Sequence, residues 1–229
     1  MLQVKALNVF YGESHTIRDV SLSVGTNEAV AVMGRNGMGK TTLFKAIIGM
    51  LPVRSGAIVL DDVPLQNQPS YRRVEAGLAY VPQGRMIFPL LTVKENILTG
   101  TEKKPLREVP GYIYDYFPVL GEMERRKGGN LSGGQQQMLA IARALVAEPK
   151  VLILDEPTEG IQPSIIKELA RTLAALRRER GISILVSEQV LSFALEVADR
   201  FLVIDRGRIV DEKHRDDAGI EDIREFLKV

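Results

Sequence analysis

The stretch Gly34-Arg35-Asn36-Gly37-Met38-Gly39-Lys40-Thr41-Thr42 decides the fold predicted for this chain. It fits the spacing G-x-x-x-x-G-K-[ST] of a loop that wraps around a polyphosphate. Glycines let the main chain curl tightly and approach closely, so that several backbone N–H groups point inward at the phosphates. All nine residues are therefore predicted to form a phosphate-binding loop.

The side chains that close this loop suit a nucleoside triphosphate. Lys40 is expected to reach the β- and γ-phosphates, and the hydroxyl of Thr41 is expected to coordinate Mg²⁺. The context supports this prediction, because the segment 29–33 reads as a buried strand. Helical spacing follows the loop in the apolar residues Leu43, Ala46, Ile47 and Met50. The helix would add unpaired amides and the positive end of its dipole, which disfavours an ordinary glycine-rich turn.

Composition limits the possible functions. The 229 residues fit one domain, with or without a subdomain, and apolar content of 45% with charged content of 26% is ordinary for a soluble protein. A net charge of +1 gives no reason to expect a nucleic-acid partner. The absence of cysteine excludes disulfides and thiolate metal sites. No apolar run approaches about 18 residues, so we expect a cytoplasmic chain that only another subunit could hold at a membrane.

The rest of the chain alternates between strand and helix patterns. Strands are expected at 2–10, 14–24, 57–60, 78–81, 151–156, 182–186, 201–204 and 208–210, and helices at 71–76, 164–178 and 220–227. Between residues 88 and 146 the pattern indicates helices and no convincing strand, with a capping box at Thr92–Glu95. An α/β fold with an inserted helical segment follows from this order.

Three further motifs carry polar side chains at the ends of these elements. The strand at 78–81 ends in Pro82-Gln83-Gly84-Arg85, which reads as a flexible joint. Leu131-Ser132-Gly133-Gly134-Gln135 precedes a helix, where Ser132 can act as the cap and the glycine pair leaves space at the exposed amides. Taken alone, that stretch is an unremarkable capping motif.

The third motif is the pair of acids that ends the strand at 151–156, after four apolar residues in a row. Carboxylates at the carboxyl end of a buried parallel strand lie where open α/β sheets bind ligands. Because side chains alternate, Asp155 is predicted to serve Mg²⁺ and Glu156 to face the attacking water as general base. Gln189 follows another central strand, so its amide is a candidate partner for the γ-phosphate or the water. Tyr11 is either an adenine-stacking ring or a half-buried turn aromatic, and both uses stay open.

With these four motifs in this order, the chain resembles an ABC-transporter ATP-binding subunit over essentially all of its length. The resemblance implies a P-loop NTPase fold of the α/β class with a mostly parallel central sheet and an antiparallel β subdomain. It implies one domain, 1–229, whose core comprises 1–83 and 147–229 and whose helical subdomain spans about 84–146. It also implies ATP and Mg²⁺ as cofactors.

Roles for individual residues follow from the same resemblance. Tyr11 looks like the adenine-stacking aromatic, and Gln83 is similar to the hinge glutamine that contacts Mg²⁺ and reports to membrane subunits. Ser132, Gly133, Gly134 and Gln135 look like the signature that contacts ATP held by an opposite protomer. The catalytic set implied is Glu156, Gln189, Gln83 and Lys40.

Two positions depart from the common family pattern. Gln162 stands where most relatives carry aspartate, and Gln189 stands where a switch histidine is expected. A neutral amide can orient the γ-phosphate and water but cannot become cationic. These departures therefore predict slow or partner-dependent hydrolysis.

The departures also suggest a subgroup. Glu188-Gln189 resembles ATPases of branched-chain amino acid importers, and the stretches 81–85, 87–89 and 155–166 look like the urea-type member. This predicts an importer ATPase with urea as solute, and branched-chain amino acids or a short-chain amide as alternatives. The implied partners are permease subunits, a second ATPase (a paralogue or a second copy) and, indirectly, a solute-binding protein, with the chain on the inner face of the membrane. A soluble ABC ATPase of DNA repair or translation is disfavoured, because 229 residues leave no room for coiled-coil arms or a second cassette.

Overall fold

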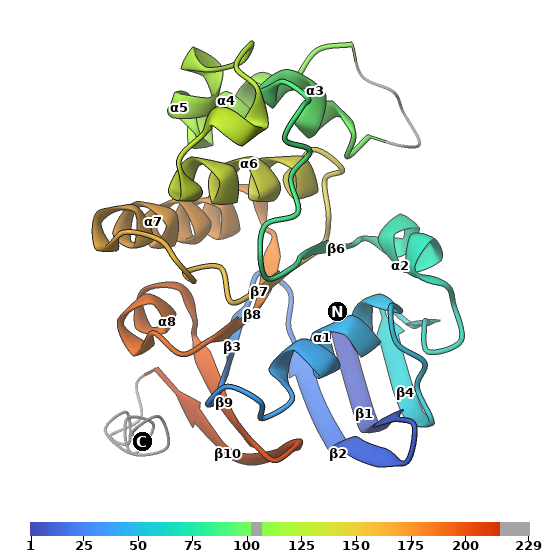
Figure 1. Ribbon diagram of the computed structural model, residues 1–229. Helices are drawn as coiled ribbons and strands as arrows, with labels where there is room; N and C mark the ends of the chain where they lie inside the picture. Colours follow the sequence, from blue (N-terminus) through green and yellow to red (C-terminus); the bar gives the residue numbers. More distant parts are fainter. Residues whose placement is uncertain (102–106, 216–229) are drawn as a thin grey trace.

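A six-stranded sheet forms the centre of the molecule, a computed structural model that describes residues 1–101 and 107–215 (Figure 1). Its strand order is β10-β9-β3-β8-β7-β6. All neighbouring pairs are parallel except β9 and β10, which form an antiparallel hairpin. The strands are β3 (Ala29–Met33), β6 (Leu78–Val81), β7 (Val151–Asp155), β8 (Ser183–Glu188), β9 (Arg200–Asp205) and β10 (Arg208–His214).

Both faces of this sheet are buried. In β3, Ala29, Ala31 and Met33 belong to one apolar cluster, whereas Val30 and Val32 belong to another. Successive side chains of a strand point to opposite faces, so a strand covered on both sides needs an unbroken apolar run. This is why the segments before the phosphate loop and before the acid pair contain no alternating polar residues.

A second sheet, antiparallel throughout, has the order β2-β1-β4-β5. It comprises β1 (Leu2–Tyr11), β2 (Ser14–Val24), β4 (Ser55–Leu60) and β5 (Val63–Pro64). Helix α1 (Lys40–Ile48) contacts β1 and β2 of this sheet and β6 and β7 of the central one. Its buried apolar residues form one cluster with buried residues of these four strands. The helix that follows the phosphate loop is therefore fixed between two sheets.

Helix α2 (Ser70–Ala76) packs against α1, and the remaining helices contribute their buried residues to the apolar cluster on the other face of the central sheet. Figure 1 shows α6 at the centre of the upper group, with α7 beneath it. The described residues between 93 and 145 contain only helical elements: α3 (Val93–Leu98), α4 (Gly111–Tyr116), α5 (Pro118–Glu122), a 3₁₀ turn (Gly128–Asn130) and α6 (Gly133–Leu145). The other helices are α7 (Pro163–Arg180) and α8 (Leu191–Val197).

Local signals in the sequence had mixed outcomes. The capping box at Thr92 and Glu95 is present as predicted. Met50, expected on the inward face of the first helix, is exposed, because α1 ends at Ile48 and Gly49 turns the chain into the left-handed region. The helix predicted at 220–227 lies outside the described residues.

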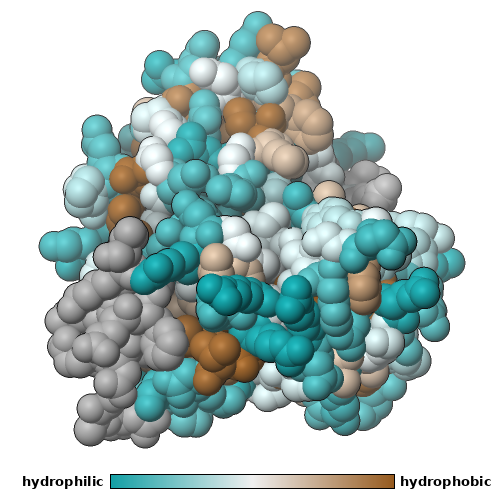
Figure 2. Space-filling model, turned by 60° about the horizontal axis from the view of Figure 1, so that its bottom comes forward, coloured by the Kyte–Doolittle hydropathy of each residue, from teal (hydrophilic) through white to brown (hydrophobic). Residues whose placement is uncertain are grey.

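The face of the molecule in Figure 2 is mostly hydrophilic, with small apolar areas scattered over it. Scattered single apolar residues are normal on a folded protein. Within residues 1–101 and 107–215, no helix has the length and apolar character needed to cross a bilayer.

Arg200 on β9 connects Glu28, in the loop before β3, with Glu212 on β10. These contacts predict that the stability of the protein depends on pH. The Arg200 guanidinium donates to Glu28 at 2.8 Å and to Glu212 at 2.7 Å. Burial alone would raise the pKa of Glu28, but hydrogen bonds from Arg200 and the Gly25 amide, with the charge of Arg200, hold it below its ordinary value of 4.5. A lowered folded-state pKa contributes stability above the unfolded-state pKa, and that stability is lost as pH falls through the folded-state value.

We therefore expect Glu28→Gln to flatten the acid side of the stability profile. In urea unfolding between about pH 5 and about pH 3, the free energy of unfolding should fall less steeply for the variant than for the parent protein. Equal slopes would mean that the ion pair with Arg200 makes no pH-dependent contribution.

Candidate functional site

The parallel strands β3, β8, β7 and β6 all end at the same edge of the central sheet, and polar residues of the site lie at or just after these ends. The register places Met33 beside Glu188 and Asp155 beside Ser187. The loops that follow β3, β6, β7 and β8 therefore leave the sheet side by side. In open α/β sheets this carboxyl edge is where ligands bind.

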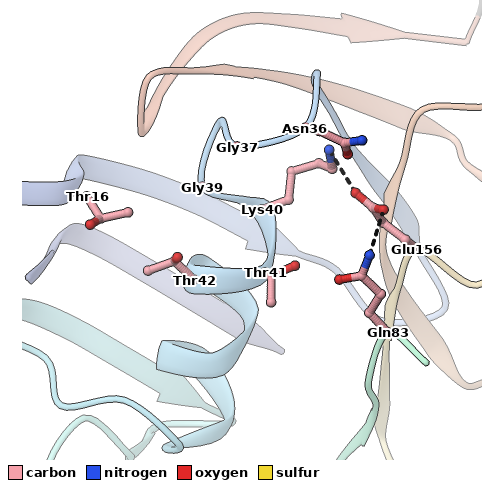
Figure 3. A pocket seen from close by; sticks show the side chains of 9 residues that line it. All are labelled: Thr16, Asn36, Gly37, Gly39, Lys40, Thr41, Thr42, Gln83 and Glu156. Atoms are coloured by element: carbon pink, nitrogen blue, oxygen red, sulfur yellow. Dashed lines mark hydrogen bonds and ion pairs between the residues drawn. The ribbon is translucent and has the colours of Figure 1, made fainter. Parts of the chain in front are cut away.

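A cavity of about 310 Å³ opens at this edge (Figure 3). Its wall brings together parts of the phosphate loop, the joint glutamine and the second acid of the acid pair. The lining residues are Thr16, Asn36, Gly37, Gly39, Lys40, Thr41, Thr42, Gln83 and Glu156. All of these except Thr16 were predicted site residues. Thr16 belongs to β2 of the other sheet, and nothing in that strand's pattern marks it.

Two glycines, Gly34 and Gly39, show why the phosphate loop needs this residue type. A Cβ on Gly34 would lie 2.6 Å from the carbonyl oxygen of Ile204, so only glycine allows the loop to pass β9 this closely. Gly39 has a φ of 109° at the N-cap of α1, and the first turn of that helix then opens onto the cavity. A helix N-terminus at this place favours an anion.

Lys40 forms a buried ion pair with Glu156. The lysine Nζ lies 3.0 Å from Glu156 Oε1, and the two side chains are 3% and 9% exposed. Lys40 also donates to the carbonyl oxygens of Gly34 at 2.6 Å and Arg35 at 3.0 Å. The cation predicted to bind phosphate thus directly contacts the carboxylate predicted to activate water.

Glu156 has an unusual backbone, with a φ of 47° in the left-handed region. Its amide donates to Ser187, reaching both the carbonyl oxygen at 3.1 Å and the hydroxyl at 3.0 Å. Backbone strain of this kind persists only where surrounding contacts enforce it, and it concentrates at functional sites. Sequence reasoning missed Ser187, because a serine at a strand end carries no distinctive signal.

Asp155 lies at the centre of a hydrogen-bond network of three hydroxyls. Oδ1 accepts from Ser187 Oγ at 2.7 Å and from Thr41 Oγ1 at 3.2 Å, while Oδ2 accepts from the Tyr80 hydroxyl at 3.1 Å. Burial and the charge of Asp155 raise the pKa of Tyr80, so its hydroxyl stays a donor. A carboxylate and a hydroxyl in contact fit Mg²⁺, which prefers oxygen ligands and usually takes few from the protein when phosphates supply the rest.

Two glutamines complete the contacts around the cavity. Gln83 Nε2 donates to Glu159 at 3.0 Å and to Glu156 at 3.4 Å, and Figure 3 shows its side chain pointing at Glu156. Gln189 Nε2 donates to Asn36 Oδ1 at 2.7 Å. The residue at the switch position therefore contacts the phosphate loop directly.

Other predicted residues lie around rather than in this cavity. The side chain of Met38 packs against the apolar cluster that contains α1. Tyr11 is the last residue of β1 and is 48% exposed. The cavity lining found within the described part of the chain includes neither of them, nor Gly34 or Arg35, whose carbonyls bind Lys40.

The stretch Ser132–Gln135 begins α6 with a capping box. The Gln135 amide donates to Ser132 Oγ at 3.3 Å, and the Ser132 amide donates to Gln135 Oε1 at 2.9 Å. A Cβ on Gly134 would lie 2.7 Å from Ile165, so this glycine is also required by packing within the chain. Among the described residues, none of these four lines the cavity that contains Lys40.

The fold and the cavity define a nucleotide-binding ATPase cassette. A family model described as ABC transporter matches residues 17–159, and the chain belongs to that family. Its members are ATPases, and this chain is one.

Relatives and solved structures agree with this assignment. The chain is 39% identical to the high-affinity branched-chain amino acid transport ATP-binding protein BraG of Pseudomonas aeruginosa, over 92% of this chain and 91% of the relative. It is 37% identical to the probable branched-chain amino acid transport ATP-binding protein LivF of Archaeoglobus fulgidus, over 91% and 90%. The crystal structure of MJ1267, an ABC-transporter cassette in its ADP conformation, superposes with a TM-score of 0.86 at 27% identity, covering 99% of this chain and 94% of that one.

Proposed function

We propose that this chain is the ATP-hydrolysing subunit of an importer for a small polar solute. The observation that supports the chemistry best is the single cavity in which Lys40, Thr41 and Glu156 meet. Lys40 and the start of α1 would bind the phosphates, while Glu156 would orient a water and accept its proton during attack on the γ-phosphorus. Asp155 and Thr41 would hold Mg²⁺, which neutralises phosphate charge when bound.

Binding of the triphosphate must change the ion pair between Lys40 and Glu156. The γ-phosphate and the Glu156 carboxylate are competing acceptors for the same ammonium group. If the Lys40 ammonium group moved from Glu156 to the γ-phosphate, the Glu156 carboxylate would be free to contact water. The base would then become available only when ATP is bound.

The signature requires a second subunit. Ser132–Gln135 begins α6, on the helical side of the molecule, and lies outside the cavity that contains Lys40. We infer that two subunits, either copies or paralogues, associate head to tail so that each signature contacts ATP held by the other. Closure of the pair would complete both sites, and hydrolysis would let it open.

The joint at Gln83 would couple this cycle to membrane partners. Gln83 contacts Glu156 in the site, and the next element in the chain is α3, the first helix of the helical segment. Permease subunits that dock on those helices would hold the chain on the inner face of the membrane, and a solute-binding protein would act through them.

Urea is the solute we propose, because the stretches 81–85, 87–89 and 155–166 resemble the urea-type member of the subgroup. Branched-chain amino acids are the second candidate, supported by what the names of BraG and LivF say of those relatives. The test is to co-express the chain with the permease genes beside its own, reconstitute the complex in vesicles, and measure ATP-dependent uptake of urea and of leucine. Uptake of leucine without uptake of urea would overturn the proposal that urea is the solute. ATPase activity with no co-purifying permease would contradict the importer.

Gln189→His tests the neutral residue at the switch position. Because imidazole can carry a proton while an amide cannot, the variant should hydrolyse ATP faster and show a pH-dependent kcat near the ordinary pKa of histidine. Steady-state ATPase assays across pH would show this. An unchanged rate and profile would mean that the substitution does not limit turnover.

A further inference from the structure

Glu188, the last residue of β8, holds a fully buried carboxylate at the edge of the site. It is 1% exposed, and it lies between Ser187 and Gln189. Its two oxygens face different segments of the chain. Oε1 accepts from the Thr158 amide at 3.2 Å, and Oε2 accepts from the Gln189 amide at 2.9 Å and the Val190 amide at 3.1 Å.

These contacts connect the loop after β7 to the loop after β8. Thr158 is two residues beyond Glu156, and its hydroxyl also hydrogen-bonds Glu188. Gln189 directs its side chain onto Asn36 of the phosphate loop. Asn36, Gln189, Glu188 and Thr158 therefore form a continuous path from the phosphate loop to the segment that carries the proposed base.

A carboxylate suits this place because every group around it is a donor. Burial raises the pKa of Glu188, and the hydrogen bonds from Thr158, Val190 and Gln189 act in the opposite direction. A glutamine of the same shape would turn its NH₂ toward one of these segments and lose that contact. An apolar residue would leave the amides of Thr158, Gln189 and Val190 without this acceptor, and the Thr158 amide is buried.

We propose that Glu188 is a positioning residue for hydrolysis, which sets the Gln189 side chain against Asn36 by clamping the loops after β7 and β8 together. This inference rests on the proposed role of Gln189 in turnover. Among the described residues, Glu188 does not line the cavity, and its carboxylate hydrogen-bonds Thr158, Gln189 and Val190 rather than the proposed base. Its effect on the reaction passes through the backbone of its neighbours.

The test is a double-mutant cycle on ATPase activity. Glu188→Gln should lower kcat about tenfold, the effect of misplacing one hydrogen-bonded group, while the Kd for ATP stays within about twofold. In a Gln189→Ala background the same change should cost less than about twofold, because the residue through which Glu188 acts is already gone. Calorimetry supplies Kd and thermal unfolding supplies the change in stability.

Glu28→Gln is the control, since it removes a different hydrogen-bonded carboxylate, one that is partly buried and does not line the cavity. It should lower the melting temperature and leave kcat at the parent value. A Glu188→Gln variant that behaves like this control, or whose loss of kcat is equally large in the Gln189→Ala background, would overturn the proposal. If Gln189→Ala alone leaves kcat unchanged, Gln189 has no role in turnover. The proposal that Glu188 acts through Gln189 is then overturned as well.

Thr158→Val keeps the test decisive if Glu188→Gln does not fold. It removes one hydroxyl from the clamp and preserves the shape of the side chain. We expect kcat to fall about threefold with the Kd for ATP unchanged, which corresponds to one weak hydrogen bond. Parent-level kcat in this variant would overturn the proposal.

Discussion

Glu156→Gln should lower kcat by a factor of about 100 to 10,000, the usual contribution of a general base, and leave ATP binding intact. Glutamine keeps the shape of glutamate but cannot accept a proton from water. Its amide oxygen still accepts from Lys40, so the contact at 3.0 Å has a neutral replacement. The backbone bonds between residue 156 and Ser187 do not involve the side chain that changes.

Single-turnover ATPase assays and calorimetry with ATP would measure both quantities. Glu196→Gln serves as control, because Glu196 is an exposed acid paired with Arg171. Its kcat should match the parent value. Hydrolysis by Glu156→Gln at more than about a tenth of the parent rate would remove Glu156 as the base.

Lys40→Ala should weaken ATP binding by about 10-fold to 100-fold, the value of a hydrogen bond to a charged group. Lys40 is the only lysine or arginine side chain in the cavity lining found within residues 1–101 and 107–215. The variant also removes the partner of the buried Glu156 carboxylate, which lowers the stability of the protein without nucleotide.

Lys45→Ala is the matched control for this variant. Lys45 lies on the same helix, in its last turn, away from the cavity. It should change the Kd for ATP by less than about twofold, since helix-terminal charges act only near their own end. Equal affinity of the Lys40→Ala and parent proteins, measured by calorimetry, would contradict the phosphate-binding role of the loop.

Patterns local in the sequence predicted the fold and much of the site. The phosphate loop, the buried strands and the capping boxes each depend on residues a few positions apart, so the sequence shows them directly. The mostly parallel central sheet was confirmed, and so was membership of the ABC transporter family. The boundaries of the helical subdomain and the roles of individual site residues stay predictions.

Contacts between distant segments escaped the sequence analysis. The hydrogen bond between Asn36 and Gln189 joins residues 153 positions apart. Thr16 reaches the cavity only because the antiparallel sheet lies against α1, and Ser187 matters only because β7 and β8 are neighbours. The left-handed φ of Glu156 is likewise set by tertiary contacts, since glutamate does not favour it.

In the mechanism that we propose, each nucleotide site is shared between two subunits. A structure of Glu156→Gln crystallised with ATP and Mg²⁺ tests it directly. We expect each γ-phosphate to lie between Lys40 of one subunit and Ser132 and Gly134 of the other. A structure with ATP at full occupancy, in which Ser132 and Gly134 of every subunit remain far from any triphosphate, would contradict it.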